Sequence, residues 1–205
     1  MLEIRLIINL NPDNARLVKN FIWLISLRGL DFLIPLLTIP YLLRTIGVER
    51  FGIIGFGYAF AAYFGAIVQY GFNVTATRDI ARSRNNCKEV GRIYSTVLLT
   101  STVLMVLTVG VAILVMLGFP KLRSDVPLYS LCLAQCMAQS LFPNWFFQGM
   151  ERMAFITYSN LAAKAAFIVG LLVLVDEPSD YLYVPLLNAA SASMVLVSSL
   201  WIVWR

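Results

Sequence analysis

The sequence contains no histidine and only three cysteines among its 205 residues. Without histidine, the chain cannot form a Cys/His metal site or a nucleophile activated by an imidazole base. It also lacks a glycine-rich phosphate loop, so we expect no nucleotide-driven motor. Cys132 and Cys136 lie four residues apart on one helical face, which disfavours a disulfide in a regular helix. We therefore expect no enzymatic activity, no bound metal and no cofactor.

Charged residues are also scarce. They make up 13% of the chain, whereas hydrophobic residues make up 60%, and the mean hydropathy is +0.78. An average soluble domain has about 25% charged and roughly 45–50% apolar residues. The composition therefore predicts an all-α fold in which membrane-spanning helices form a polytopic bundle.

Six apolar stretches are each about 20 residues long, the length that a bilayer-spanning helix needs. The loops between them are too short for a folded soluble domain, so we expect residues 1–205 to form one unit. Glu3 and Asp13 interrupt the first twenty residues, which predicts a polar lead-in and no cleavable signal peptide. The predicted spans are approximately 21–43, 51–72, 93–118, 127–149, 155–175 and 181–204.

Basic residues are distributed unevenly between the two sides of these predicted spans. Cytoplasmic loops of membrane proteins carry an excess of Lys and Arg, so the richer side is predicted to be cytoplasmic, with both termini. This pattern accounts for the net charge of +5, and we expect no nucleic-acid partner. The ten residues on the richer side are Arg5, Arg16, Lys19, Arg78, Arg82, Arg84, Lys88, Arg92, Arg152 and Arg205. The four on the other side are Arg44, Arg50, Lys121 and Arg123.

Small residues and prolines indicate how the predicted helices pack and bend. Gly57, Ala61 and Gly65 recur every four residues in the second span, a pattern that lets membrane helices approach closely. Pro35 lies inside the first span and Pro143 inside the fourth. A proline inside a helix removes one backbone hydrogen bond, so we expect a bend or break at each position.

Two ionisable residues, Arg28 and Asp31, lie three apart in the first predicted span. A charged group at this depth costs at least a few kcal/mol unless it faces a partner or a wet cavity. One interpretation is a pair that only neutralises itself. The other is that both face a central cavity, where Arg28 attracts an anionic group and Asp31 takes a coupling proton or cation.

The fifth predicted span contains a third buried charge, Lys164, with Asn160 one turn before it. No acidic residue is nearby in the same span, so we expect Lys164 and Asn160 to face a polar cavity that binds substrate. Gln69, at the end of the second span, and Asn188, in the sixth, are weaker candidates. Buried amides as often join one membrane helix to another.

Residues 142–152 combine aromatic and polar side chains at the predicted cytoplasmic end of the fourth span. The aromatic residues alone would suit an interfacial belt, and the basic loop from Asn73 to Arg92 would suit an ordinary cytoplasmic loop. The alternative is a cytoplasmic gate or a contact with anionic lipid head groups. Its candidate residues are Asn73, Arg78, Asn144, Trp145, Gln148, Glu151 and Arg152.

Four segments, in order along the chain, resemble the polysaccharide transporter family, the Wzx-type O-antigen flippases. They are IPYLLRTIG at residues 39–47, YGFNVTATR at 70–78, PNWFFQGMER at 143–152 and PSDYLYVP at 178–185. The resemblance implies a bacterial inner-membrane carrier of the multidrug/oligosaccharidyl-lipid/polysaccharide exporter superfamily, with a MATE-like fold of two six-helix lobes around a cavity. It implies no enzyme and no cofactor.

The resemblance also implies a substrate and partners. Such proteins move undecaprenyl-diphosphate-linked repeat units to the periplasmic leaflet by alternating access, coupled to an ion gradient. Membrane lipids, the polysaccharide polymerase and chain-length proteins are implied partners. On charge grounds, Arg28 and Lys164 would bind the diphosphate or an acidic sugar.

The chain differs from the family in length, because family members have about twelve spans and alternating access moves one such half against another. We therefore expect only the N-terminal lobe, present as a fragment, a truncated gene product or half of a dimer, which would not transport alone. Two alternatives remain. Half of a MATE-like multidrug exporter would have an acidic cavity, and a scaffold subunit of polysaccharide assembly would tolerate loss of its buried charges.

Overall fold

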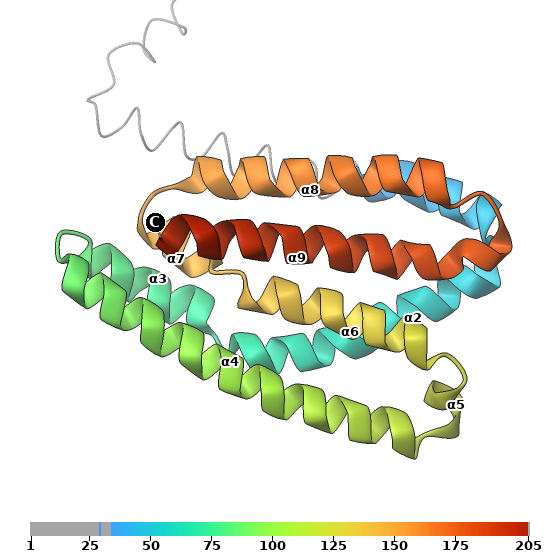
Figure 1. Cartoon of the computed structure of the whole chain (residues 1–205), viewed down its shortest axis with the longest axis horizontal. Helices are drawn as coiled ribbons and strands as arrows, with labels where there is room; N and C mark the ends of the chain where they lie inside the picture. Colours follow the sequence, from blue (N-terminus) through green and yellow to red (C-terminus); the bar gives the residue numbers. More distant parts are fainter. Residues whose placement is uncertain (1–28, 30–33, 205) are drawn as a thin grey trace, which may run out of the picture.

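The computed structural model describes all residues except 1–28, 30–33 and 205, and the described residues contain helices but no β-strand. The long helices lie side by side along one direction (Figure 1). Residues 34–45 are helical. They are followed by α2 (Gly47–Gln69), α3 (Phe72–Ser83), α4 (Cys87–Gly118), α5 (Pro120–Arg123), α6 (Val126–Leu141), α7 (Asn144–Gly149), α8 (Met153–Leu174), the 3₁₀ helix η1 (Pro178–Leu182) and α9 (Tyr183–Trp204).

Four segments of the described chain are long and apolar enough to cross a membrane: Gly47–Ser83, Cys87–Gly118, Met153–Leu174 and Pro178–Val203. This confirms the predicted all-α, polytopic membrane bundle. The predicted first span lies partly outside the described residues, and the predicted span 127–149 consists of α6 and α7. A total of six spans therefore stays a prediction.

The break between α6 and α7 lies at Phe142 and Pro143. Proline has no N–H to donate, and its ring clashes with the carbonyl four residues earlier, here that of Gln139. The residue before a proline also disfavours helical angles, and Phe142 has ψ 122°. The chain therefore leaves the helix after Leu141 and begins a new short helix at Asn144.

Helix α3 lies in a segment that was predicted to be a cytoplasmic loop. The predicted loop from Asn73 to Arg92 is helical over most of its length, because α3 covers its first half and α4 already begins at Cys87. A turn at Tyr70 and Gly71 separates α3 from α2, and Gly71 there has φ +78°. Glycine adopts this left-handed conformation without strain.

The small residues of α2 pack against α6, as the sequence predicts. A Cβ atom added to Gly57 would lie 2.9 Å from Cδ2 of Leu128, and one added to Gly65 would collide with Sγ of Cys136. Cys136 Sγ donates a hydrogen bond of 3.2 Å to the carbonyl oxygen of Ala61. The two backbones therefore approach closely along this face.

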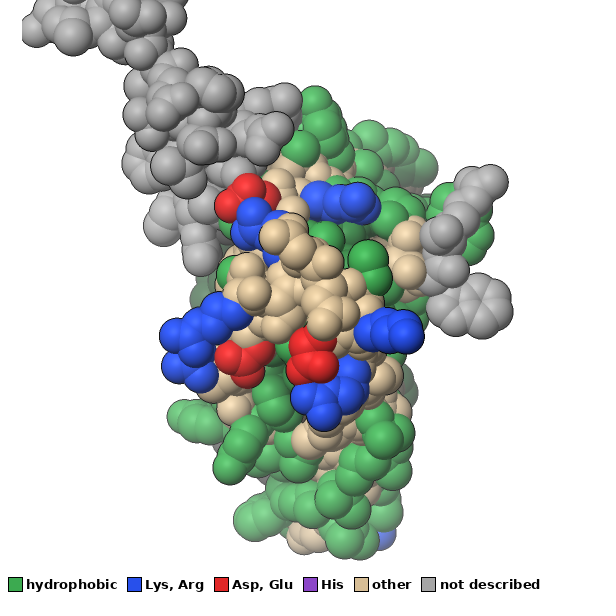
Figure 2. Space-filling view, turned by 90° about the vertical axis from the view of Figure 1, so that its left-hand side faces the viewer, with side chains coloured by type: hydrophobic (Ala, Val, Ile, Leu, Met, Phe, Trp, Pro, Cys, Tyr) green, Lys and Arg blue, Asp and Glu red, His purple; other side chains and the backbone are tan. Residues whose placement is uncertain are grey.

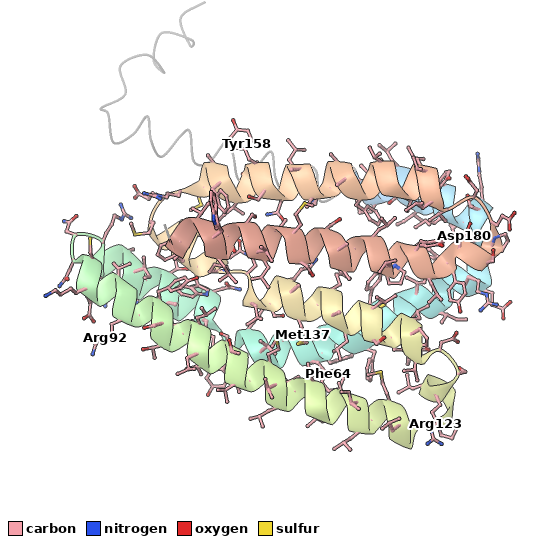
Figure 3. The ribbon with its side chains drawn as sticks, viewed as in Figure 1. Phe64, Arg92, Arg123, Met137, Tyr158 and Asp180 are labelled. Carbon is pink, nitrogen blue, oxygen red and sulfur yellow. The ribbon has the colours of Figure 1, made fainter. Side chains whose placement is uncertain are left out.

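The two ends of the bundle differ in charge. One end, on the left in Figure 1, comprises the α3–α4 turn, α7, the start of α8 and the end of α9. Figure 2 shows this end face-on, with Lys and Arg side chains interspersed with Asp and Glu. Arg92 lies at this end, whereas Arg123 and Asp180 lie at the other (Figure 3). We call the two ends the basic end and the η1 end.

Candidate functional site

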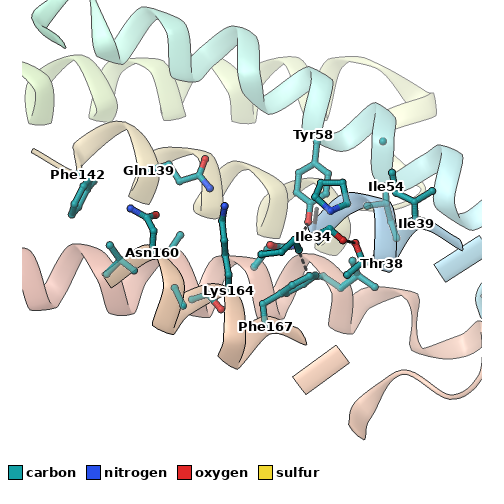
Figure 4. Close-up of a pocket in the computed structure, with 18 of the residues that line it drawn as sticks. Ile34, Thr38, Ile39, Ile54, Tyr58, Gln139, Phe142, Asn160, Lys164 and Phe167 are labelled. Atoms are coloured by element: carbon teal, nitrogen blue, oxygen red, sulfur yellow. Dashed lines mark hydrogen bonds between the residues drawn. The ribbon is translucent and has the colours of Figure 1, made fainter. Parts of the chain in front are cut away.

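A cavity of about 800 Å³ lies between the helix at residues 34–45 and helices α2, α6, α7, α8 and α9. Figure 4 shows side chains from several of these helices converging on it. Ligand-binding pockets commonly have volumes of about 300–1,000 Å³. Its polar lining consists of Thr38, Tyr58, Gln69, Gln139, Asn144, Gln148, Asn160, Lys164, Asn188 and Ser191.

Lys164 is the charged residue of this lining. Of the lining residues that the structure describes, it alone carries a formal charge. It lies midway along α8, where burial in lipid would be costly, and Figure 4 shows it extending with Asn160 toward Gln139 of α6. A cationic group beside amides can bind an anionic group of a ligand, while the amides bind hydroxyl groups of the same ligand.

Two amides of the lining use their nitrogen atoms within the protein. Asn160 Nδ2 donates to the carbonyl oxygen of Ile156 at 2.8 Å. Asn188 Nδ2 donates to Tyr58 Oη at 2.8 Å and to the carbonyl oxygen of Val184 at 3.2 Å. These bonds engage the amide nitrogens and not the side-chain oxygens, which are hydrogen-bond acceptors, and Tyr58, which accepts from Asn188, can still donate its hydroxyl proton.

Amides of the lining gather toward the basic end, whereas the lining toward the η1 end includes apolar residues beside Thr38, Tyr58 and Asn188. Gln69 lies at the end of α2, and Asn144 and Gln148 lie in α7, all near the basic end. The opposite part of the lining includes the buried residues Leu42, Ile54, Phe167 and Val184. A hydrophilic ligand is therefore best accommodated near the basic end.

Beyond the apolar part, contacts between aromatic and charged residues join the helices at the η1 end. Tyr41 Oη donates to the carbonyl oxygen of Val175 at 2.9 Å. Tyr181 Oη donates to Oδ1 of Asp125 at 3.1 Å, and the guanidinium carbon of Arg50 lies 4.6 Å from the centre of the Tyr181 ring. These contacts hold the helix ends together on this side.

The structure places six of the predicted site residues at the cavity: Gln69, Asn144, Gln148, Asn160, Lys164 and Asn188. They come from α2, α7, α8 and α9, so the fold brings together residues that are up to 119 positions apart in the sequence. Arg28 and Asp31 lie outside the described residues. Their pairing and the bend expected at Pro35, one turn after Asp31, stay predictions.

The other predicted residues do not line the cavity and make structural contacts instead. Trp145 is buried, with its ring 5.5 Å from that of Tyr94. The remaining contacts are those of Glu151 with Arg84 at 3.0 Å, Asn73 Nδ2 with Gln69 Oε1 at 3.1 Å, Arg78 with Asp79 at 3.4 Å, and the backbone N–H of Arg152 with the carbonyl oxygen of Phe147 at 2.8 Å.

Four polar lining residues were not predicted from the sequence: Thr38, Tyr58, Gln139 and Ser191. Gln139 carried a usable signal, because it is an uncharged amide inside an apolar span, as Gln69 and Asn188 are. Tyr58 lies in an apolar run of α2 that also contains Tyr63, and only the rotation of that helix in the bundle directs Tyr58 into the cavity.

Comparison with known proteins finds one matching family and two curated relatives. The sequence profile of the family described as "Polysaccharide biosynthesis protein" matches residues 17–205. A "Putative O-antigen transporter" from Escherichia coli (strain K12) is 34% identical over 171 residues, covering 83% of this chain and 41% of the relative. A protein of the same name from Shigella dysenteriae is 28% identical over 169 residues, covering 79% of this chain and 40% of the relative.

The chain spans about two fifths of the length of these curated relatives. No solved structure matches it. The family profile, in contrast, covers nearly the whole chain, from residue 17 to its last residue. The chain therefore belongs to the polysaccharide biosynthesis protein family.

Proposed function

We propose that this chain forms one wall of a cavity through which a saccharide repeat unit, linked to undecaprenyl diphosphate, crosses the bacterial inner membrane. The observation that carries the proposal is the position of Lys164, a lysine at mid-helix in a cavity whose other described lining residues are amides, hydroxyls and apolar groups. The family match and the names of the two curated relatives support the same class of cargo.

The chemistry of the lining suits such a cargo. The ammonium group of Lys164 is a compact charge that attracts a phosphate or a sugar carboxylate. The amide oxygens of Asn160 and Asn188 accept hydrogen bonds from sugar hydroxyls, and the Tyr58 hydroxyl donates one. Most of the discrimination would then come from hydrogen bonds, with one ionic contact to fix the anionic group.

The charge of the two ends supports an orientation of the cavity in the membrane. On the positive-inside rule the basic end, and with it both termini, would be cytoplasmic. The six basic residues at this end are Arg78, Arg82, Arg84, Lys88, Arg92 and Arg152. The polar part of the cavity would then receive its cargo from the cytoplasmic leaflet. Arg28 is proposed as a second anion contact, and Asp31 as the site of the coupling ion.

The test is complementation of a flippase-deficient bacterium with the protein expressed from its own gene. Lys164→Met removes the charge and keeps the length of the side chain, so we expect it to lower the amount of surface polysaccharide by about tenfold or more. Lys164→Arg should retain most export. Lys88→Met, which removes an exposed charge at the start of α4, is the matched control and should export normally.

Two outcomes would contradict the proposed role of Lys164 in binding cargo. If Lys164→Met and Arg28→Ala both export normally at wild-type protein levels, the cavity does not bind cargo through these charges. That result is also the one expected for a scaffold subunit of polysaccharide assembly. Loss of export in both the Lys164→Met and the Lys88→Met variants would show that positive charge anywhere in the chain matters, which equally contradicts the proposal.

A further inference from the structure

Helix α7 is short, yet it contributes two amides to the cavity. It has six residues, from Asn144 to Gly149, and both Asn144 and Gln148 line the cavity. A helix of this length is unstable in isolation, because nucleation costs more than so few backbone hydrogen bonds return. Its orientation must therefore be set by contacts with the rest of the protein.

Arg84, which follows α3, contacts the end of α7 through three nitrogen atoms. Its Nε and Nη2 donate to the carbonyl oxygen of Gly149 at 3.2 and 3.0 Å. Its Nη1 lies 3.0 Å from Oε2 of Glu151. The last carbonyls of a helix have no partner within the helix, and a basic side chain satisfies them while opposing the helix dipole.

The same end of α7 lies directly against α3. A Cβ atom on Gly149 would lie 2.6 Å from Cγ2 of Ile80 and 3.0 Å from the carbonyl oxygen of Thr77. Ile80 is completely buried. One turn earlier, Trp145 packs on Tyr94 of α4. Because α7 is held on this outer side through Trp145 and Gly149, the adjacent face, with Asn144 and Gln148 four residues apart, lines the cavity.

We propose that Arg84 is a positioning residue for this cavity. Its guanidinium group holds the last turn of α7 so that Gln148, and through the same helix Asn144, reach the cavity. In the sequence Arg84 is one of several basic residues of a predicted cytoplasmic loop. In the structure its guanidinium group contacts the end of α7. This inference rests on the proposed function in one respect, which is that the cavity is the site where cargo binds.

The experiment measures the position of α7 without measuring transport. In a background carrying Cys87→Ser, Cys132→Ala and Cys136→Ser, a single cysteine replaces Gln148 or Asn160. The rate at which a water-soluble maleimide modifies each cysteine is then measured in native membranes. The test variant is Arg84→Gln, and the matched control is Arg82→Gln, which removes the same charge two residues earlier from an exposed position.

Arg84→Gln removes the guanidinium group that contacts Gly149 and Glu151, so we expect the modification rate at position 148 to rise by about tenfold or more. The rate at position 160 should stay the same, since Asn160 belongs to α8. Arg82→Gln should change neither rate. If Arg84→Gln is not inserted stably, Glu151→Gln, which removes one of the three contacts, should give a smaller rise at position 148.

Two outcomes would overturn the inference. An unchanged rate at position 148 would show that α7 keeps its place without Arg84. Equal rises at positions 148 and 160 would show a general loosening of the bundle. Because neither readout involves export, the inference about Arg84 can fail while Lys164 is still required for transport, and the converse also holds.

Discussion

The hydroxyl oxygen of Tyr58 in α2 accepts a hydrogen bond of 2.8 Å from Nδ2 of Asn188 in α9. The two residues are 130 positions apart, and both line the cavity. The bond therefore joins two membrane helices at the wall of the site. It also fixes which groups face a ligand, because the amide nitrogen is engaged while the phenol proton remains available.

Replacing both partners should show that this bond contributes a small amount of stability. Hydrogen bonds between membrane helices contribute about 0.6 kcal/mol on average in double-mutant cycles. We expect a coupling free energy of about that size from Tyr58→Phe, Asn188→Ala and the double variant, measured by reversible unfolding in detergent. A coupling near zero would show that the two side chains do not interact in the membrane-embedded protein.

Export should respond to the same substitutions differently. Tyr58→Phe removes the hydroxyl group that we propose donates to the cargo, so surface polysaccharide should fall severalfold even though the protein remains folded. Thr100→Val is the matched control, because Thr100 is exposed on α4 and its hydroxyl donates only to the carbonyl oxygen of Thr96 within that helix. Normal export by Tyr58→Phe would remove Tyr58 from the set of cargo contacts.

The close contact between α2 and α6 predicts a large difference between two glycines of α2. Gly65→Ala would place a Cβ atom against Sγ of Cys136, whereas Gly52→Ala meets nothing within 4 Å. Overpacking of this kind costs about 1–3 kcal/mol, so Gly65→Ala should lower the unfolding temperature in detergent and Gly52→Ala should not.

Cys136→Ala provides the rescue for this prediction, because it removes the sulfur atom that the added methyl group would meet. The double variant Gly65→Ala, Cys136→Ala should recover part of the lost stability. The recovery should be partial, since Oγ of Ser140 would still lie 3.1 Å from the new Cβ atom. No recovery at all would mean that the strain arises elsewhere than at this contact.

At the η1 end, the ring and the hydroxyl of Tyr181 have separable roles. Tyr181→Phe removes the hydrogen bond to Asp125 and keeps the ring beside Arg50, whereas Tyr181→Leu removes both. A cation–π contact at an exposed site contributes about 0.5–1 kcal/mol. Thermal stability should therefore decrease in the order Tyr, Phe, Leu. Equal stability of the Phe and Leu variants would show that the contact between Arg50 and the ring does not stabilise the protein.

The long helices were predictable from the sequence because the signal for a membrane span is local. A run of apolar residues is sufficient to identify α4, α8 and α9, whatever they pack against. Helix α3 was missed because its sequence is polar and short. Its helical form depends on burying Ala76 and Ile80 against α4 and α7, and such tertiary contacts are not visible in a local pattern.

The candidate site was only partly predictable for a related reason. Lys164 and Asn160 were found because a polar residue inside an apolar span is costly wherever it points. Tyr58 was not found, because a tyrosine in such a span is unremarkable until the rotation of α2 is known. Arg84 was counted as a loop charge, since its role depends on where α7 ends after the break at Pro143.

The orientation of the bundle can be tested with a cysteine that the chain already has. Cys87 is exposed at the start of α4, at the basic end, whereas Cys132 is buried in α6. If the basic end is cytoplasmic, a membrane-impermeant maleimide should modify Cys87 in inverted membrane vesicles and not in intact spheroplasts. Ser179→Cys, exposed in η1, should show the opposite pattern in a background carrying Cys87→Ser. Modification of Cys87 from outside intact spheroplasts would reverse the assignment, and the polar part of the cavity would then face the periplasm.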